Sequence, residues 1–349
     1  MKKTLIAVAA LGLSGAAMAQ SLVTLYEPGA LPEPHPNTGA TQSSVTLYGV
    51  ADAGLGKIKS PGFRTPSTPD DSGKTQFISA SLMNNADSRL GVRGVEDLGG
   101  GLRAGFAFET GLDLDDGGGA NGQGAGAFWA RQANVSLTGG WGSVKLGRQY
   151  TPSTLVTSMF ELTPGNNYSL LGNAYRYVSL GTRANSAFAY VTPNFNGLSA
   201  QAAFISKNDR PDGKNLWDLG AVYANGPIVA GASANKVAGG KTSYQLGGRY
   251  NFGHFALVAS YTQATNVLKG DANALRRGFE LGGNVTYGAF SVTLDLSRDT
   301  KNEWIATSKK YTNGLLELKY ALSRRTFVYG AFLRLDGENN YGMGIRHNF

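Results

Sequence analysis

The chain has 349 residues, a formal net charge of +8 at pH 7 and no cysteine. The lack of cysteine excludes a disulfide framework and thiolate chemistry. Its 49 glycines and 12 prolines are scattered along the chain, which argues against a disordered or collagen-like protein. Basic proteins often bind nucleic acid. The export signal and strand pattern described next favour a positively charged lumen or surface instead, so no nucleic-acid partner is predicted.

Residues 1–19 are predicted to form a cleaved secretory signal peptide. Lys2 and Lys3 precede a run that is apolar through Leu13, and small residues of a cleavage site end at Ala19. Removing 19 of 349 residues leaves 330, and losing two lysines lowers the charge from +8 to +6. No later stretch reaches the roughly 20 apolar residues of a membrane helix, which still leaves membrane-spanning strands possible.

Residues 20–41 are interpreted as an N-terminal Pro-rich extension. The sequence of residues 20–26 is nearly repeated at residues 42–48, with six of seven positions matching. Four prolines lie between the two copies, and a segment of that kind cannot form a barrel strand. We therefore take the second copy as the first strand. A local duplication without a role explains the repeat more simply.

From Ser43 onward, short alternating runs of polar and apolar residues are separated by two kinds of connection. Tight turns rich in Gly, Asn and Pro are predicted at 96–100, 139–142, 193–197, 225–227, 251–253, 287–289 and 322–324. Longer polar connections are predicted at 60–75, 115–126, 149–175, 207–215, 238–242, 266–276, 300–309 and 336–340. The two kinds alternate, and these fifteen connections imply sixteen strands. The sequence thus predicts an all-β fold over residues 42–349, a transmembrane antiparallel up-and-down β-barrel.

The carboxyl end carries the clearest strand pattern. Tyr341, Met343, Ile345, His347 and Phe349 share one face, and the residues between them are glycine or polar. A soluble domain would normally leave such an end frayed and polar. A terminal aromatic residue on an apolar face is typical of the last strand of an outer-membrane barrel. We interpret Tyr341, Ile345 and Phe349 as an outer-membrane assembly signal.

The same alternation predicts which residues face the lumen. Arg89 and Arg93 lie opposite Leu90 and Val92 along one predicted strand. An arginine that faced lipid near the bilayer centre would cost about 2–4 kcal/mol. The arginines are therefore expected to point inward and the apolar residues outward.

Five stretches of this sequence resemble the trimeric general porins of Gram-negative bacteria, of the beta-proteobacterial, Neisseria-like type and its anion-preferring branch. They are SSVTLYGVADAG at 43–54, SRLGVRGVEDLGGGLRAGF at 88–106, GSVKLGRQ at 142–149, YVTPNF at 190–195 and GIRHNF at 344–349. The resemblance covers residues 43–349. The extension at 20–41 departs from the family pattern, which begins at the equivalent of Gln42.

The resemblance implies a sixteen-stranded barrel that trimerises through the wall around its first and last strands. It also implies a third external loop folded into the lumen as a constriction, and residues 149–175 hold that position. Glu161 is the only carboxylate of this stretch, which Arg148 and Arg176 bracket. Cation-preferring relatives set several loop acids against wall arginines, so the scarcity of acids here favours a positive constriction.

The family's wall arginines correspond to Arg89, Arg131 and Arg183. Strict alternation would place Arg131 on the outer face, and a bulge near the strand end could re-aim it inward. The predicted constriction also includes Tyr48, Asp52, Glu109, Arg148 and Glu161. Asp52 and Glu109 are expected to pair with arginines as structural ion pairs. Arg103, Lys145, Arg148 and Lys236 either extend the positive field toward the mouths or are solvated surface charges.

Catalytic and metal sites find little support. His35, His254 and His347 are far apart in sequence, and none has a Ser or Asp partner at a recognisable spacing. The acidic cluster around Asp115 lacks the spacing of a twelve-residue calcium loop, and a solvated external loop explains it better. No enzymatic activity, cofactor or metal is predicted.

The sequence therefore predicts an outer-membrane porin that lets small hydrophilic solutes and ions diffuse passively, with a preference for anions. The predicted partners are two further copies of the chain, outer-membrane lipid and lipopolysaccharide, the barrel assembly machinery and small anionic solutes. One alternative is a channel specific for phosphate or a dicarboxylate. A more distant one is a non-transport barrel, either an enzyme or an adhesin.

Overall fold

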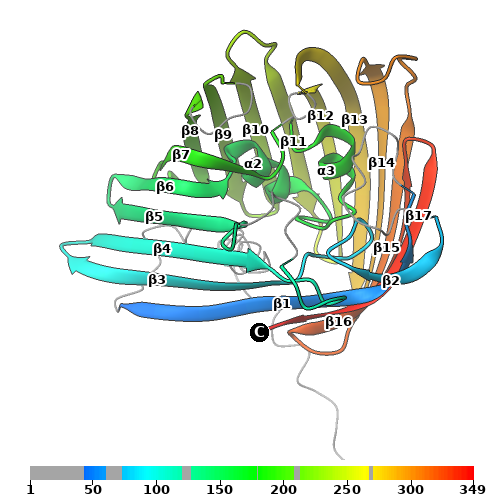
Figure 1. Ribbon diagram of the computed structural model, residues 1–349, viewed down its shortest axis with the longest axis horizontal. Coiled ribbons are helices and arrows are strands. Elements are labelled where there is room, and N and C mark those ends of the chain that lie inside the picture. The colour runs from blue at the N-terminus through cyan, green and yellow to red at the C-terminus, as the bar shows by residue number, and fades with distance from the viewer. Residues whose placement is uncertain (1–42, 60–72, 120–126, 179, 208–212, 267–269) are drawn as a thin grey trace, which may run out of the picture.

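The computed structural model describes residues 43–59, 73–119, 127–178, 180–207, 213–266 and 270–349. These residues form one sheet of seventeen strands that closes on itself, with two helices inside it (Figure 1). The strands are β1 (Ser44–Lys57), β2 (Thr75–Ser79), β3 (Arg89–Gly99), β4 (Leu102–Gly111), β5 (Gln132–Gly139), β6 (Gly142–Tyr150), β7 (Arg183–Val191), β8 (Leu198–Ile205), β9 (Leu216–Asn225), β10 (Ile228–Val237), β11 (Ser243–Asn251), β12 (Phe255–Asn266), β13 (Asp271–Tyr287), β14 (Phe290–Asn302), β15 (Thr312–Ala321), β16 (Thr326–Leu335) and β17 (Glu338–Asn348). The helices are α2 (Pro152–Phe160) and α3 (Leu170–Tyr175).

The seventeen strands occupy sixteen positions in the wall. β2 pairs with the second half of β1, and β3 pairs with its first half, so the two lie end to end along one side of β1. On the other side β1 pairs with β17, from Val50 opposite Asn348 to Lys57 opposite Tyr341. Every neighbouring pair is antiparallel, and the predicted closed sixteen-stranded barrel is confirmed.

Residues 80–88, here called the insert, leave the wall between β2 and β3 and fold inward. Asn84 and Asn85 are fully buried, and Asn85 Nδ2 donates to Glu317 Oε2 on β15 at 3.3 Å. Ala80 turns the chain at the start of the insert with φ of +50°. The sequence pattern did not reveal this interruption, because a long polar connection precedes the insert and a regular strand follows it.

Burial confirms that the barrel is apolar outside and polar inside. Along β14, Leu294 and Leu296 are 52% and 47% exposed, whereas Thr293 and Asp295, which alternate with them, have no exposed surface. β17 alternates in the same way, with Ile345 on the exposed face. A soluble sandwich would bury its leucines, so this inverted pattern fits a barrel wall that faces lipid.

The seven predicted tight turns all connect neighbouring strands as expected, but two predicted long connections are short. Between β16 and β17 only Asp336 and Gly337 lie outside the strands, and both have positive φ, +50° and +92°. An Asp-Gly pair in that conformation makes a two-residue hairpin. The predicted connection 266–276 was also wrong in extent, since β13 already begins at Asp271. In both places polar residues that were predicted to form a loop belong to the strands and extend their pairing.

The connection between β6 and β7, residues 151–182, is here called the inner segment. It carries α2 and α3, which lie within the ring of strands (Figure 1). Thr151 caps α2 by accepting a hydrogen bond from the Thr154 N–H. The wall is indented to receive α2, because a Cβ atom at Gly247 would lie 2.5 Å from the Phe160 ring. No helix among the described residues is long and apolar enough to cross a membrane.

Candidate functional site

Two acidic side chains that point into the barrel accept hydrogen bonds from the inner segment. The carboxylate of Asp218 on β9 accepts hydrogen bonds from the N–H and the hydroxyl of Ser153, at 3.0 and 2.6 Å. Glu317 on β15 accepts from Asn166 Nδ2 at 3.0 Å and from the Tyr168 hydroxyl at 2.5 Å. Both carboxylates are fully buried. Their charges are thus engaged by donors of the inner segment.

Glu161 of the inner segment lies in a cluster of acidic side chains. Its carboxylate accepts a hydrogen bond from the Ser169 hydroxyl and is completely buried. Burial, reinforced by the nearby Asp295 carboxylate, raises the pKa of the Glu161 carboxyl well above its usual range. Glu280 completes the patch and accepts from the Ser260 hydroxyl at 2.6 Å. The structure therefore places the carboxylate of Glu161, which the sequence analysis had assigned to the constriction, between the inner segment and acidic residues of the wall.

Glu109 gathers three predicted site residues on the opposite wall. Arg131 Nε donates to Glu109 Oε1 at 2.6 Å, and the Tyr48 hydroxyl donates to Oε2 at 3.0 Å. Arg89 Nε lies 3.6 Å from the same Oε2 atom. The expected ion pairs of Glu109 are therefore present. Tyr48 and Arg89 are almost fully buried, so they support the wall and present little surface to the lumen.

The conflict over Arg131 is resolved by its position at a strand end. β5 begins one residue later, at Gln132, which is buried on the inner face. Because Arg131 lies just before the strand, its side chain need not follow the alternation of inward and outward residues. It reaches Glu109 and Asp87. The residue therefore points inward, as the resemblance implied.

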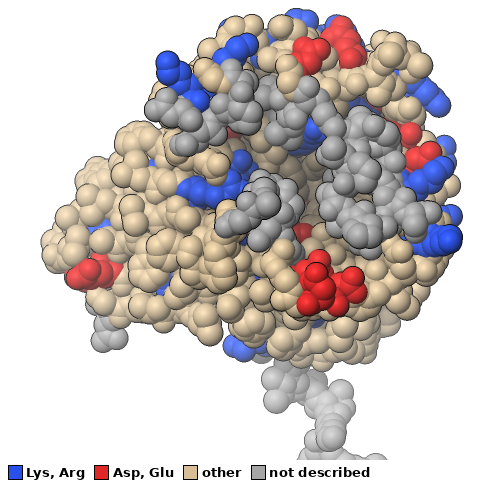
Figure 2. Space-filling view, viewed as in Figure 1, with Lys and Arg blue, Asp and Glu red and all other residues tan. Residues whose placement is uncertain are grey.

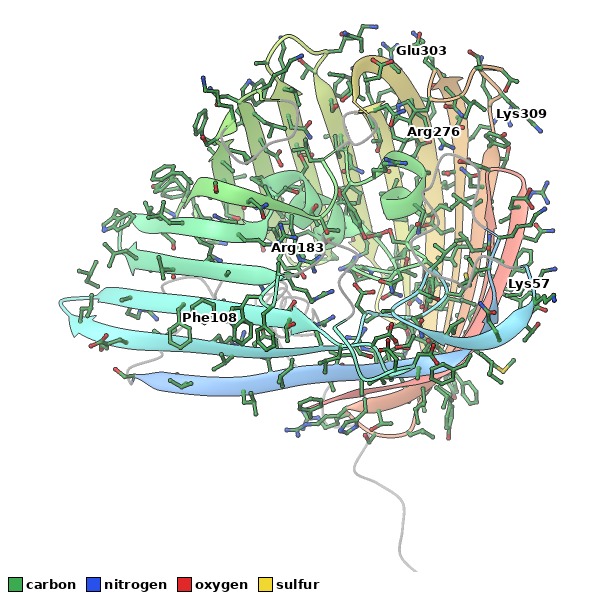
Figure 3. The ribbon with its side chains drawn as sticks, in the orientation of Figure 1. Lys57, Phe108, Arg183, Arg276, Glu303 and Lys309 are labelled. Atoms are coloured by element: carbon green, nitrogen blue, oxygen red, sulfur yellow. The ribbon has the colours of Figure 1, made fainter. Side chains whose placement is uncertain are left out.

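Arg148 and Arg183 lie on β6 and β7, and both are partly exposed. Arg148 Nε donates to the Ala130 carbonyl at 2.5 Å. Arg183 Nη2 donates to the Tyr150 hydroxyl at 2.6 Å, and its guanidinium lies 4.4 Å from the centre of that ring. Both of these acceptors are neutral oxygens. Figure 3 shows Arg183 at the inner ends of these strands, where Figure 2 shows basic side chains gathered around the hollow.

Asp52 differs from its predicted role. Its carboxylate accepts from Asn84 Nδ2, the Ala86 N–H and the Tyr329 hydroxyl, at 3.1, 2.9 and 2.7 Å. It is fully buried beneath the insert and is held by these neutral donors, while Arg346 lies opposite it on β17. Asp52 therefore fixes the insert against the wall.

Among the basic residues predicted near the mouths, Lys236 shares the outward face of Ala232.

Sequence reasoning missed Asp87, Asp218 and Glu317. Alternation could have assigned Asp218 and Glu317 to the inner face, since each sits between outward apolar residues. Nothing in the pattern indicates that the inner segment meets them. Asp87 lies in the unrecognised insert, so neither its inward position nor its contact with Arg131 could be inferred.

The carboxyl-terminal aromatic residue closes the barrel. Phe349 and Gly49 exchange two backbone hydrogen bonds, each 3.0 Å long. Tyr341, Ile345 and Phe349 are all exposed on the outer face, as alternation predicted.

Within the described ranges, no group of three or more His, Asp or Glu side chains could hold a metal ion.

Comparisons with known proteins agree with this architecture. A family model described as Gram-negative porin matches residues 4–340. Outer membrane porin protein 32 of Delftia acidovorans is 29% identical over 365 residues, which covers 98% of this chain and 92% of that protein. An outer membrane porin of Bordetella pertussis is 28% identical over 412 residues and is matched along the full length of both chains.

The solved structure of the anion-selective porin from Comamonas acidovorans shares the fold. It matches with a TM-score of 0.69 and 28% sequence identity, over 88% of this chain and 100% of that chain. The closed antiparallel barrel with its apolar exterior is the architecture of these proteins. The chain therefore belongs to the Gram-negative porin family and is a channel-forming protein of the outer membrane.

Proposed function

We propose that this porin prefers small anions among the hydrophilic solutes that diffuse through it. The observation that carries the proposal is the unequal exposure of acidic and basic side chains inside the barrel. Asp218 and Glu317 are buried under donors of the inner segment, whereas Arg148 and Arg183 are partly exposed and donate to neutral oxygens. An ion in the lumen therefore meets more positive than negative charge at this level.

Arginine suits this role because it stays protonated and offers planar donors to carboxylate or phosphate. Conduction requires that attraction be weak and spread over several groups, since a tight site would retain the solute. The stacking of Arg183 on Tyr150 fixes one guanidinium without neutralising it. Salt should weaken the preference, because screening acts over about 10 Å at 0.1 M. The inner segment supplies the steric limit by occupying part of the lumen.

A channel specific for phosphate or a dicarboxylate is the second candidate. The observation that favours it is the closeness of the three guanidinium groups: Arg148 donates to the carbonyl of Ala130, the residue before Arg131, and to the side chain of Asn185 on the strand of Arg183. Two planar donors at one level could bind a divalent anion in bidentate fashion.

Conductance of the reconstituted protein separates these candidates. We expect single-channel conductance to rise in proportion to KCl and to stay unblocked by phosphate or succinate. Saturation with either anion would favour the specific channel. Absence of any conductance would favour a non-transport barrel, an enzyme or an adhesin, which we do not propose.

We also propose that the protein is a homotrimer. One solved structure that shares its fold, the outer membrane protein OmpT of Vibrio cholerae, is described as a trimer form. We further expect the chain to be exported through the predicted signal peptide, to be inserted by the barrel assembly machinery and to contact lipopolysaccharide. The predicted signal peptide and the extension at 20–41 lie outside the described residues.

A further inference from the structure

We propose that Asp87 sets the strength of the anion preference and positions the inner segment beside the arginines. The inference rests on the proposed anion preference, and it adds a residue from the insert to the selectivity determinants. Asp87 belongs to none of the strands and directly precedes Ser88 and Arg89.

One carboxylate joins three parts of the fold. Asp87 Oδ2 accepts a hydrogen bond from Arg131 Nη1 at 2.7 Å, which ties the insert to the wall beside β5. Asp87 Oδ1 accepts from Asn167 Nδ2, also at 2.7 Å, which ties the insert to the inner segment. The same Asn167 nitrogen donates to the Ser81 carbonyl at 2.9 Å. Loss of the Asp87 acceptor would therefore weaken the docking of the inner segment at this point.

Exposure distinguishes Asp87 from the other carboxylate on Arg131. The Glu109 side chain is 1% exposed and the Asp87 side chain 32% exposed. Water and mobile ions therefore reach Asp87, whereas Glu109 acts from behind the wall. The negative charge that a permeating ion meets next to Arg131 is that of Asp87.

The charges at this point are close to balance. The ion pairs of the described residues join Arg89 and Arg131 to Glu109 and Asp87, two cations against two carboxylates. Neutralising Asp87 would remove the most exposed charge of these ion pairs and leave them one positive charge in excess. A unit charge acting through water at 4–8 Å changes the access of one monovalent ion by roughly two- to sixfold, and the chloride-to-potassium ratio changes by more because the two ions respond in opposite directions.

Two substitutions separate the two roles of this residue. Asp87→Asn removes the charge and keeps an oxygen that can accept from Asn167. Asn167→Ala keeps the charge and removes the hydrogen bonds to the inner segment. Asp116→Asn is the matched control, because Asp116 is an exposed acid outside the barrel strands whose carboxylate accepts a local hydrogen bond from the Gly118 N–H.

The test is the zero-current potential of each reconstituted full-length channel across a KCl gradient, with current noise recorded in parallel. We expect Asp87→Asn to raise the chloride-to-potassium permeability ratio at least about twofold, and Asp116→Asn to leave it unchanged. Asn167→Ala should keep the ratio and increase the current noise. Asp87→Glu, which restores the charge, should bring the ratio back toward that of the parent protein.

An unchanged permeability ratio in a conducting Asp87→Asn channel would overturn the proposal. Should that variant fail to insert, Asp87→Ser provides the same neutralisation with a smaller side chain. The test distinguishes failure of this proposal from failure of the proposed anion preference. A parent channel that prefers potassium would refute that preference, yet a shift toward chloride in Asp87→Asn would still support the assignment of Asp87.

Discussion

Ser153 and Asp218 join the start of α2 to the barrel wall through two hydrogen bonds on one carboxylate. The first-turn N–H groups of a helix lack partners within the helix, and its N-terminus favours a negative charge. Asp218 on β9 supplies both an acceptor and that charge. The wall thus fixes the orientation of α2 through a residue that looks, in the sequence, like one more inward polar position.

The first prediction concerns this contact. Asp218→Ala should destabilise the docked inner segment by about 1–3 kcal/mol, because the donors of Ser153 lose their acceptor in a buried site. Single-channel recordings should show more frequent closures than in the parent protein, and thermal unfolding in detergent should begin earlier. Asp218→Asn, which keeps one acceptor oxygen, should fall between the two. Closure rates identical in all three proteins would contradict this account.

The second prediction concerns pH and Glu161. Because the pKa of Glu161 is raised in the folded protein, the folded state holds a proton that the unfolded state releases. The stabilisation from this group should therefore be complete below the unfolded pKa of about 4.3. It should be lost as pH rises from there through the raised pKa. Glu161→Gln should remove this part of the pH dependence, which denaturant unfolding at a series of pH values measures. Parallel curves for the two proteins would refute the prediction.

The third prediction concerns the fit of α2 against β11. A side chain at Gly247 would meet the Phe160 ring, so Gly247→Val should push α2 toward the open lumen and lower the single-channel conductance. Gly330 is the control, because a Cβ atom there has no neighbour closer than 4.0 Å. Gly330→Ala should conduct like the parent channel. Equal conductance for Gly247→Val would show that α2 does not border the conducting path.

The fourth prediction concerns assembly. Phe349 closes the ladder with Gly49 and is exposed on the outer face. Deleting Phe349 should lower the yield of folded protein in the outer-membrane fraction, through the lost closing bonds and through loss of the predicted assembly signal. Met343→Ala, a change at another outward position of β17, serves as the control. An undiminished yield without Phe349 would contradict the assembly role.

The fold was predictable because alternation is a local property. The alternation of Leu294 and Asp295 with their sequence neighbours is enough to assign them to opposite faces. The Gly-, Asn- and Pro-rich composition of the turns is likewise local, and it predicted seven of the connections. The two long connections that proved short were misjudged for the same reason. Polar residues in a strand that continues beyond the membrane have the composition of a loop.

The site was only partly predictable, since its contacts join residues far apart in sequence. Alternation gave the inward direction of Arg89, but not its burial behind Glu109. The contact between Glu317 and Tyr168 spans 149 positions and depends on how the inner segment folds. No periodic pattern records such a contact. Family resemblance supplied the inward arginines, and only the structure showed Asp87 between Arg131 and Asn167.

The measurement that tests the central claim most directly is the zero-current potential of the reconstituted parent channel across a KCl gradient. It should be compared with that of the Arg148→Gln, Arg183→Gln double variant. The account predicts a potential of the sign set by chloride, reduced when the two partly exposed guanidinium groups are removed. A potential of the sign set by potassium, or one that the double substitution leaves unchanged, would contradict it.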